Sequence, residues 1–346
     1  MTIINKFKTV SNTAFLPSFA KMKTDNQTQH IIVTGGAGFI GSNIVDSLLK
    51  LNYRVTVVDN LDDFYDPEIK RSNIQHHFYN PGFTFHKLDI TNIDAINNNL
   101  TDNYQAIIHL AAKVGVRESI ANPIAYSKVN TDGTLNLLNF AKEKGIGQFV
   151  FASSSSVYGI NPSIPWKEET EIDSIISPYA VSKRAAELYG MTFSRLYNIR
   201  FLVLRLFTVY GPRQRPDLAI NKFVNEVLGK KPLKIFGNGD SKRDYTYVTD
   251  VADAFIKAVD YKKTNFEIFN IGHSTPISLL ELIHKIEVVF GFPAHVEFTG
   301  MQTGDVPVTF ANITKALKSL EYNPKVDIDA GLKLYKEWLE KLKIEN

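Results

Sequence analysis

The sequence predicts an α/β protein with a doubly wound parallel sheet, and two observations carry that prediction. Short apolar, β-branched runs recur up to about residue 210, and a segment with helical spacing of apolar residues follows each run. Uninterrupted apolar strands are expected where helices cover both faces of a parallel sheet. Alternation of such strands with helices therefore predicts a Rossmann-like doubly wound domain. The runs are IIVTG, RVTVVDN, AIIHLAA, QFVFASS and FLVLRLF.

Length and composition are those of an ordinary globular protein. The chain has 346 residues, of which 44% are hydrophobic and 22% charged. Lysine and arginine number 39 against 36 acidic residues, with no long basic block, so we expect no nucleic-acid partner. Because the chain has no cysteine, disulfides, zinc–thiolate sites and cysteine nucleophiles are excluded, and no metal is predicted. We expect a cytoplasmic protein without stable membrane insertion, since no apolar run reaches the roughly 18–20 residues that span a bilayer.

Composition divides the chain into three parts. Residues 1–29 carry four lysines before the first acid, Asp25, and are predicted to be an N-terminal extension. This extension is interpreted as an arm packed on the protein or a partner, or as a weak targeting or membrane-surface segment. Residues 30–210 and 244–275 form the predicted nucleotide domain. Residues 211–243 and 276–346 are richer in Gly, Pro and charge, and form a predicted smaller C-terminal α/β substrate lobe.

The segment TGGAGFIG, residues 34–41, predicts a dinucleotide-binding turn. Its glycines at 36, 38 and 41 match GxGxxG between a strand and a helix, where backbone N–H groups can meet a pyrophosphate. Asp59 ends the next strand, and a carboxylate there hydrogen-bonds the adenosine ribose and repels a 2′-phosphate, so the predicted cofactor is NAD.

Further cofactor contacts are predicted at the ends of the following strands. Asp89 is interpreted either as an adenine contact or as a helix N-cap, and Asn130 either as a cofactor contact or as a cap. The full predicted set is Gly35, Gly38, Phe39, Ile40, Gly41, Asp59, Asn60, Asp89, Ile90, Leu110, Ala111, Ala112, Asn130, Tyr179 and Lys183.

The segment SPYAVSK, residues 177–183, predicts a catalytic helix. Tyr179 and Lys183 lie four residues apart and therefore share one helical face. A tyrosine is a poor base at its reference pKa of ~10, but a nearby lysine ammonium and a positive nicotinamide ring favour the phenolate. Lowering the pKa by about 3 units requires roughly 4 kcal/mol.

These motifs resemble the extended short-chain dehydrogenases/reductases over about residues 30–340, and among them the nucleotide-sugar 4-epimerases. The resemblance also rests on HLAA, ASSSSVYG, GPRQRPD, SKRDYTYV and GDVPVTFA. VDNLDDFYDPEIK, GVRESI, LFTVYGPRQRPD and MQTGDVPVTFA are similar to UDP-glucuronate 4-epimerases in particular.

The resemblance implies NAD-dependent epimerisation at C4 of a UDP-sugar through a 4-keto intermediate. It makes Ser154, Tyr179 and Lys183 the catalytic residues. Tyr179 removes the C4 hydroxyl proton, Lys183 holds the cofactor ribose and lowers the pKa of the tyrosine, and Ser154 shares the hydrogen bond to the hydroxyl. Ser153, its neighbour, is expected to serve strand packing. A homodimer through helices near 120–144 and 178–197 is also implied.

The resemblance also implies which residues meet the substrate. Ser155 and Ser156 stand where sibling dehydratases and decarboxylases carry acids, so elimination at C5–C6 lacks its residues. A donor-rich, uncharged strand tip favours UDP-glucuronate, converted to UDP-galacturonate, although each serine has strand-end packing as its alternative role. The predicted substrate residues are Arg117, Ser154, Ser155, Ser156, Thr208, Arg215, Lys234, Ile235, Phe236, Arg243, Asp305 and Thr309.

The C-terminal lobe leaves the choice of sugar open. Thr309 stands where hexose-only epimerases carry a bulky tyrosine, so UDP-glucose, UDP-N-acetylglucosamine or its uronic acid are alternative substrates. Gln302 replaces a diphosphate-binding arginine, which transfers that role to Arg243, unless Arg243 is only a surface charge. Asp305 would take the uridine ribose.

Two further ligand-binding roles and one alternative class of protein are also predicted. Residues 233–237 would meet the uracil, and Arg117 is a second carboxylate or phosphate ligand. A non-catalytic nucleotide-binding scaffold is a remote alternative. The intact set of glycines, tyrosine and lysine argues against it.

Overall fold

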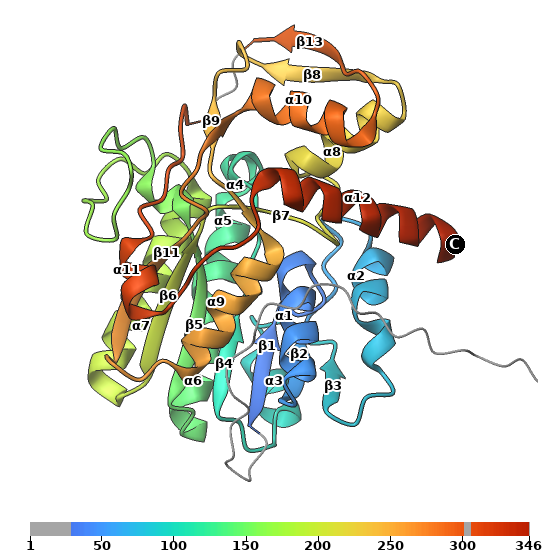
Figure 1. Cartoon of the computed structure of the whole chain (residues 1–346). Coiled ribbons are helices and arrows are strands. Elements are labelled where there is room, and N and C mark those ends of the chain that lie inside the picture. The colour runs from blue at the N-terminus through green and yellow to red at the C-terminus, as the bar shows by residue number, and fades with distance from the viewer. Residues whose placement is uncertain (1–28, 301–305, 346) are drawn as a thin grey trace, which may run out of the picture.

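A seven-stranded parallel sheet forms the centre of the computed structural model, which describes residues 29–300 and 306–345 (Figure 1). Its strand order, β11-β6-β5-β4-β1-β2-β3, is the doubly wound order, and every neighbouring pair is parallel. The predicted fold class is therefore confirmed. The strands are β1 His30–Thr34, β2 Arg54–Val58, β3 Phe83–His86, β4 Ala106–His109, β5 Gln148–Ser154, β6 Arg200–Leu206 and β11 Phe266–Ile271.

Helices cover both faces of this sheet. On one face α1 (Phe39–Lys50) and α9 (Val248–Asp260) pack side by side, and Ile44, Leu48 and Phe255 are fully buried there (Figure 1). The other face carries α3 (Ile93–Asn99), α6 (Gly133–Lys144) and α7 (Pro178–Tyr197). The uninterrupted apolar strands of the sequence are explained by this double covering. Short helical segments are α2 Pro67–Ile74, η1 Gln75–His77, α4 Val116–Ala121, α5 Pro123–Tyr126, η2 Ser127–Asp132 and η3 Ser155–Tyr158.

A smaller α/β lobe lies at one end of the sheet (Figure 1). It has its own core, in which Phe223, Leu282 and Leu332 are buried. Its elements are α8 Ala219–Leu228, β8 Pro232–Phe236, α10 Leu279–Phe290, β13 His295–Thr299 and α12 Ile328–Glu345. Short strand pairs join it to the sheet, namely β7 Thr208–Tyr210 with β10 Tyr245–Tyr247, and β9 Lys242–Arg243 with β12 Ile277–Ser278.

One helix of the C-terminal segment packs on the nucleotide domain instead. Helix α11 (Thr314–Ser319) lies against β11, and Ala316, Leu320 and Tyr322 join the core beneath the sheet. The chain thus returns to the first domain between β13 and α12 of the lobe.

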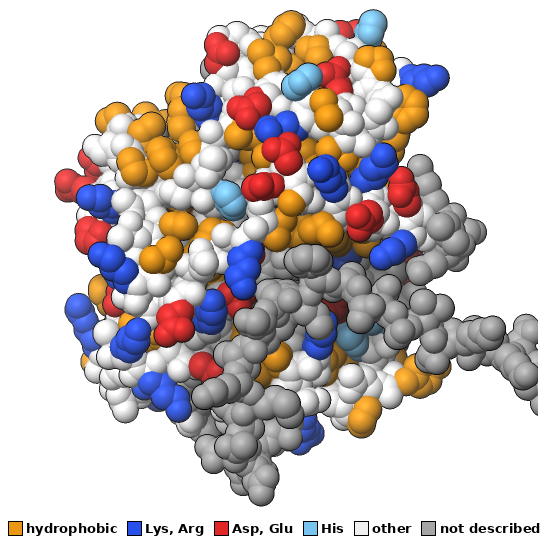
Figure 2. Space-filling model, viewed as in Figure 1, with side chains coloured by type: hydrophobic (Ala, Val, Ile, Leu, Met, Phe, Trp, Pro, Cys, Tyr) orange, Lys and Arg blue, Asp and Glu red, His pale blue; other side chains and the backbone are white. Residues whose placement is uncertain are grey.

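Charged side chains of both signs lie on the face of the molecule that Figure 2 shows. On the face in Figure 2, acidic and basic side chains intermingle with hydrophobic ones. Among the described residues, no helix combines the length and apolarity that crossing a membrane requires. The predictions for residues 1–28, Gln302 and Asp305 lie outside the described residues.

An ion pair joins α7 to the sheet in the middle of the nucleotide domain. The Arg205 guanidinium on β6 donates to both oxygens of Glu187, at 3.0 and 2.8 Å, and both side chains are buried. Ser153 on β5 donates to the same carboxylate at 2.6 Å. Burial opposes the charged carboxylate, but the hydrogen bonds and charge of Arg205 hold the pKa of Glu187 below its ordinary value.

Glu187→Leu is expected to lower the free energy of unfolding by about 3–5 kcal/mol, because Arg205 cannot lose its charge and would be buried without a counter-ion, with only the Tyr158 hydroxyl and the Glu168 carbonyl oxygen left as acceptors. The change is measured by urea denaturation followed by circular dichroism. The double variant Glu187→Leu/Arg205→Met should recover most of the loss. The matched control is Lys285→Met, which removes an exposed pair with Asp329 and should cost less than about 1 kcal/mol. Equal losses in the two single variants would contradict this ranking.

Candidate active site

The glycine-rich turn stands where β1 passes into α1. Gly35 has a φ of 70°, and a Cβ on it would lie 2.7 Å from the backbone nitrogen of Ala111, so no larger residue fits there. A Cβ on Gly41 would lie 2.2 Å from the Gly35 carbonyl oxygen, so this position also excludes a side chain. Gly38 is the N-cap of α1, and a Cβ on it would meet only the Gly35 oxygen, at 3.3 Å. The turn therefore presents the free N–H groups of a helix start beside open space.

The predicted carboxylate lies directly behind this turn. Asp59 is buried at the end of β2, where it accepts hydrogen bonds from the backbone N–H groups of Ala37 (3.1 Å) and Leu61 (2.9 Å). Burial raises its pKa, while these two donors and Lys70 work against that rise. Asp59 thus has one oxygen fixed on the glycine turn and the other on the loop that follows β2.

The ends of β2 and β3 are tied together next to it. Asn60 donates to Asp89 at 3.1 Å, and the other Asp89 oxygen accepts from the backbone N–H and the hydroxyl of Thr91. Asp89 therefore closes a local turn at residues 89–91. Ile90 is buried, and its side chain fills the space beside Gly133.

The backbone that follows β4 lies close enough to the start of the glycine turn to form hydrogen bonds with it. Leu110 donates from its backbone to the Thr34 carbonyl oxygen at 3.0 Å, and Ala111 donates to the Thr34 hydroxyl. Asn130 caps no helix, because it lies inside η2. Its side chain accepts from the backbone N–H of Lys113 at 2.7 Å, and donates to the Lys113 carbonyl oxygen at 2.9 Å and to the Ser182 hydroxyl. Its side chain thereby fixes the segment after β4 against helix α7.

The three predicted catalytic side chains meet at the end of β5. Tyr179, in the first turn of α7, is hydrogen-bonded to Ser154, the last residue of β5. Lys183 is one turn further along α7, and its ammonium donates to the carbonyl oxygen of Ala152 at 2.8 Å. Ser177 caps α7 by accepting from the backbone N–H of Ala180, which fixes where the helix and its tyrosine begin.

Two groups oppose the effect of burial on Tyr179 in the free chain. Burial raises the pKa of Tyr179, and the groups that oppose this rise are the Ser154 hydroxyl and the charge of Arg215. Lys183 is not among them, so the expected lysine effect stays a prediction for the complex with the cofactor. The reason is that Lys183 is buried, with a pKa lowered to about 7, and is directed at a backbone carbonyl.

The four serines of β5 and η3 have separate environments. Ser153 is buried against Glu187, as expected for strand packing. Ser154 donates to the Ser156 hydroxyl at 3.1 Å and accepts from the Ser156 backbone N–H, so it also caps η3. Ser154, Ser155 and Ser156 are all half-buried, which places three hydroxyls at the strand tip beside Tyr179.

Three further predicted substrate residues, Arg215, Arg117 and Phe236, make side-chain contacts in the structure. Arg215 donates to both oxygens of Asp217, at 2.9 and 2.7 Å, and its guanidinium lies 5.6 Å from the centre of the Phe64 ring. The guanidinium of Arg117 on α4 lies 5.3 Å from the centre of the Phe236 ring on β8, which joins the nucleotide domain to the lobe.

The remaining substrate positions in the described ranges are held by backbone contacts. The backbone N–H of Thr208 donates to the Asp244 carbonyl oxygen, and the hydroxyl of buried Thr309 accepts from the Asp244 N–H at 3.1 Å. Arg243 donates to the Lys242 carbonyl oxygen. On β8, Lys234 is exposed, whereas Ile235 is fully buried in the lobe core and leaves only its backbone for a ligand.

Two residues with structural roles in this site are absent from the sequence predictions. Glu187 lies one turn beyond Lys183 on the same face of α7, and this helical spacing was the available signal. Asp244 is fully buried and accepts from the backbone N–H groups of His273, Ser274 and Ala311. Its partners are distant in sequence, so no local pattern could have identified it.

Known proteins resemble this chain over nearly its whole length. The sequence model of the NAD dependent epimerase/dehydratase family matches residues 31–272. A UDP-glucuronate 4-epimerase of Thermodesulfobacterium geofontis is 41% identical over 311 residues, covering 89% of this chain and 95% of that protein.

Solved structures are similar to the same extent. The UDP-glucuronic acid 4-epimerase of Bacillus cereus, in complex with UDP-glucuronic acid and NAD, is 34% identical with a TM-score of 0.84, covering 91% of this chain and 100% of that one. A UDP-glucose 4-epimerase of Thermotoga maritima, solved with UDP-glucose, is 33% identical with a TM-score of 0.83, covering 91% and 100%.

Lys183 is expected to titrate at a pKa of about 7 in the ligand-free protein, because its burial disfavours the ammonium. The measurement is the pH dependence of 13C chemical shifts in protein labelled at lysine Cε, with Lys183→Met to assign the signal. The matched control is Lys285, whose pKa is raised by its hydrogen bond to Asp329, so it should still be charged at pH 9. A Lys183 signal that titrates near 10.5 would refute the expectation.

Proposed function

This chain belongs to the NAD dependent epimerase/dehydratase family, and we propose that it is an isomerase that converts UDP-glucuronate to UDP-galacturonate by inversion at C4. The observation that carries the choice of substrate is the uncharged tip of β5, where three half-buried serines stand and Ser154 contacts Tyr179. The family assignment supports C4 epimerisation of a UDP-sugar with NAD, and the tip supports the uronic acid among the possible sugars.

The residues of the glycine turn fit NAD. The start of α1 offers free backbone N–H groups, and Gly38 leaves the space beside them open to a pyrophosphate, while Gly35 lets the turn pack closely against Ala111. Asp59, held by two backbone N–H groups, would accept from the adenosine ribose, because a carboxylate oxygen can accept more than one hydrogen bond. When bound, NAD supplies a reversible hydride acceptor for the carbon at C4.

The proton at the C4 hydroxyl is moved by Tyr179. Its phenolic oxygen takes the proton as C4 is oxidised and returns it when C4 is reduced from the opposite face of the sugar. Ser154, already hydrogen-bonded to Tyr179, would hold the same hydroxyl in place. Arg215 favours the phenolate by its charge, and Lys183 would hold the cofactor ribose from the next turn of α7.

The carboxylate of a uronic acid sets a further requirement on this site. A 4-keto uronate is a β-keto acid. It loses CO₂ when its C5–C6 bond aligns with the π orbitals of the C4 carbonyl, so the carboxylate must be held away from that alignment. Ser155, Ser156 and Thr208 are neutral donors that would hold it without adding an acid. Arg215 uses two of its five donors on Asp217 and has others left for the sugar.

A second candidate substrate is UDP-N-acetylglucosamine, and Thr309 is the observation that favours it. Its hydroxyl is bound to the Asp244 backbone, which fixes a small side chain at this position of the lobe. A small residue leaves room for a larger substituent on the sugar.

The deciding experiment incubates the purified protein separately with UDP-glucuronate, UDP-glucose and UDP-N-acetylglucosamine, and follows the sugar products by proton NMR. UDP-galacturonate is expected to form fastest. The matched control, Tyr179→Phe, removes only the phenolic oxygen and should reduce turnover at least a hundredfold while the protein still binds NAD. Turnover of only the neutral sugars would overturn the proposed substrate, and near-normal rates in Tyr179→Phe would assign the base to another group.

A homodimer is supported by an apolar surface on α5 and α7. Val181, Leu188 and Leu196 on α7 are 55%, 43% and 65% exposed, and Ile124 on the adjacent α5 is 81% exposed. A surface depression between these helices is lined by Pro123, Val181, Ala185 and Tyr189, among others. A second copy of the chain would cover these side chains. The cytoplasmic location stays a prediction.

The double variant Val181→Glu/Leu188→Glu is expected to convert a dimer to a monomer, because it places two charges in the proposed interface. Light scattering coupled to size-exclusion chromatography gives the mass. The control is Val288→Glu, at a 69% exposed position of α10 in the lobe, which should remain dimeric. A monomeric wild-type protein at micromolar concentration would contradict the proposed interface.

A further inference from the structure

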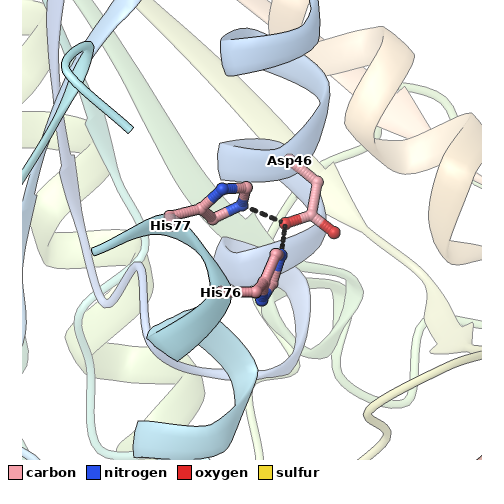
Figure 3. Close-up of side chains that lie close together, drawn as sticks. All are labelled: Asp46, His76 and His77. Carbon is pink, nitrogen blue, oxygen red and sulfur yellow. Dashed lines mark hydrogen bonds and ion pairs between the residues drawn. The ribbon is translucent and has the colours of Figure 1, made fainter. Parts of the chain in front are cut away.

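Two histidines and an aspartate converge on the surface between α1 and η1 (Figure 3). Asp46 lies on α1, and His76 and His77 are consecutive residues of η1. The Nε2 atoms of His76 and His77 lie 3.3 and 2.7 Å from the same oxygen, Oδ1 of Asp46. One ligand atom from each residue lies within 4.8 Å of the other two. The cluster is therefore a compact set of three donor atoms from two separate elements.

The spacing of these atoms matches that of ligands around one small cation. Tetrahedral Zn²⁺ holds His nitrogens and carboxylate oxygens at about 2.0–2.1 Å, which places neighbouring ligand atoms about 3.3 Å apart. The two nitrogen–oxygen distances in the cluster are 3.3 and 2.7 Å, so small side-chain rotations would admit an ion. Two imidazoles and one carboxylate are also ligands that suit Zn²⁺ and related transition metals.

We propose that Asp46, His76 and His77 bind a divalent transition-metal ion of the Zn²⁺ type, with water completing its coordination. The site is accessible, because the His76 and Asp46 side chains are 47% and 35% exposed. His77, at 12%, is held on the inner side and is packed beside the Phe83 ring. An exposed ligand gives the ion a path of entry, and a fixed ligand gives the site its shape.

Arg213 holds the carboxylate in the orientation that this site requires. Its guanidinium lies 2.8 Å from Oδ2 of Asp46, so Oδ1 is left to face the two histidines. Such contacts behind a ligand orient it toward the metal.

The ion would cross-link two helical segments beside the glycine-rich turn. It would join η1 to α1, the helix that this turn opens. Helix α2, which precedes η1, is already attached to the turn, because Asn73 donates to the Ala37 carbonyl oxygen at 3.0 Å. The predicted role is thus structural, and it does not rest on the proposed function, since Ser154 and Tyr179 stand on other elements.

The test uses the full-length protein without a histidine tag, stripped of metal with EDTA and then dialysed. Zn²⁺ is titrated by isothermal calorimetry, with Co²⁺ and Mg²⁺ titrated in parallel. We expect one Zn²⁺ per chain, weaker Co²⁺ binding and no Mg²⁺ binding, because Mg²⁺ prefers oxygen ligands. His76→Ala and His77→Ala should each weaken Zn²⁺ binding at least tenfold. The matched control is His295→Ala, at an exposed position of β13, which should bind as the wild type does.

Thermal unfolding gives a second, independent measurement. Zn²⁺ at one hundred times its Kd for the wild type should raise the Tm of the wild type by roughly 5 °C, and the same concentration should raise that of His76→Ala by no more than about half as much. If His77→Ala does not fold, the half-exposed His76→Ala decides the outcome alone. Absence of stoichiometric Zn²⁺ binding by the wild type, or equal affinity in His76→Ala and the wild type, would overturn the proposal.

Discussion

The buried ion pair between Glu187 and Arg205 is the interaction on which the candidate site depends. Arg205 belongs to β6 and Glu187 to α7, so the pair fixes the catalytic helix on the sheet. The third partner, Ser153, lies next to Ser154, and therefore the same carboxylate also positions the strand end that faces Tyr179. The Glu187 carboxylate accepts four hydrogen bonds, two from Arg205 and one each from Ser153 and Arg184. Sliding of the helix is therefore restricted, because any displacement would leave charges unpaired in a nonpolar interior.

The same pair acts on the lysine of the site through space. Burial disfavours a charged Lys183, and the Glu187 carboxylate one helical turn away is the group that works in the opposite direction. Lys183 is thereby left close to the balance between its charged and neutral forms. A cofactor that adds hydrogen-bond acceptors beside Lys183 would shift this balance toward the ammonium. The lysine effect on Tyr179 that the sequence suggests is accordingly expected only in the complex, while Arg215 supplies the charge in the free chain.

Local patterns in the sequence predicted the features whose causes are local. The sheet follows from strand composition, and the glycine turn follows from GxGxxG. The placement of Tyr179 and Lys183 on one face of a helix follows from their spacing, and all three signals lie within short segments. The return of α11 to the nucleotide domain has no such signal, since Ala316 and Leu320 look equally suited to either core. Asp46 lies thirty residues before His76, and only the packing of α1 against η1 brings the two together. Long-range contacts of this kind are visible only in the folded chain.

The buried carboxylate of Asp244 is a further link between the C-terminal segment and the nucleotide domain. Asp244 accepts backbone N–H groups from the segment after β11 and from residue 311, while its own backbone bonds Thr208 and Thr309. Two candidate sugar-binding residues, from segments one hundred residues apart, are therefore fixed on one residue. Their distance from the serine tip is set by the fold before any ligand binds. A site with fixed walls restricts which group a bound sugar can present at each position. Retention of the acidic C6 group would then depend on the neutral hydroxyls at the tip and on Arg215.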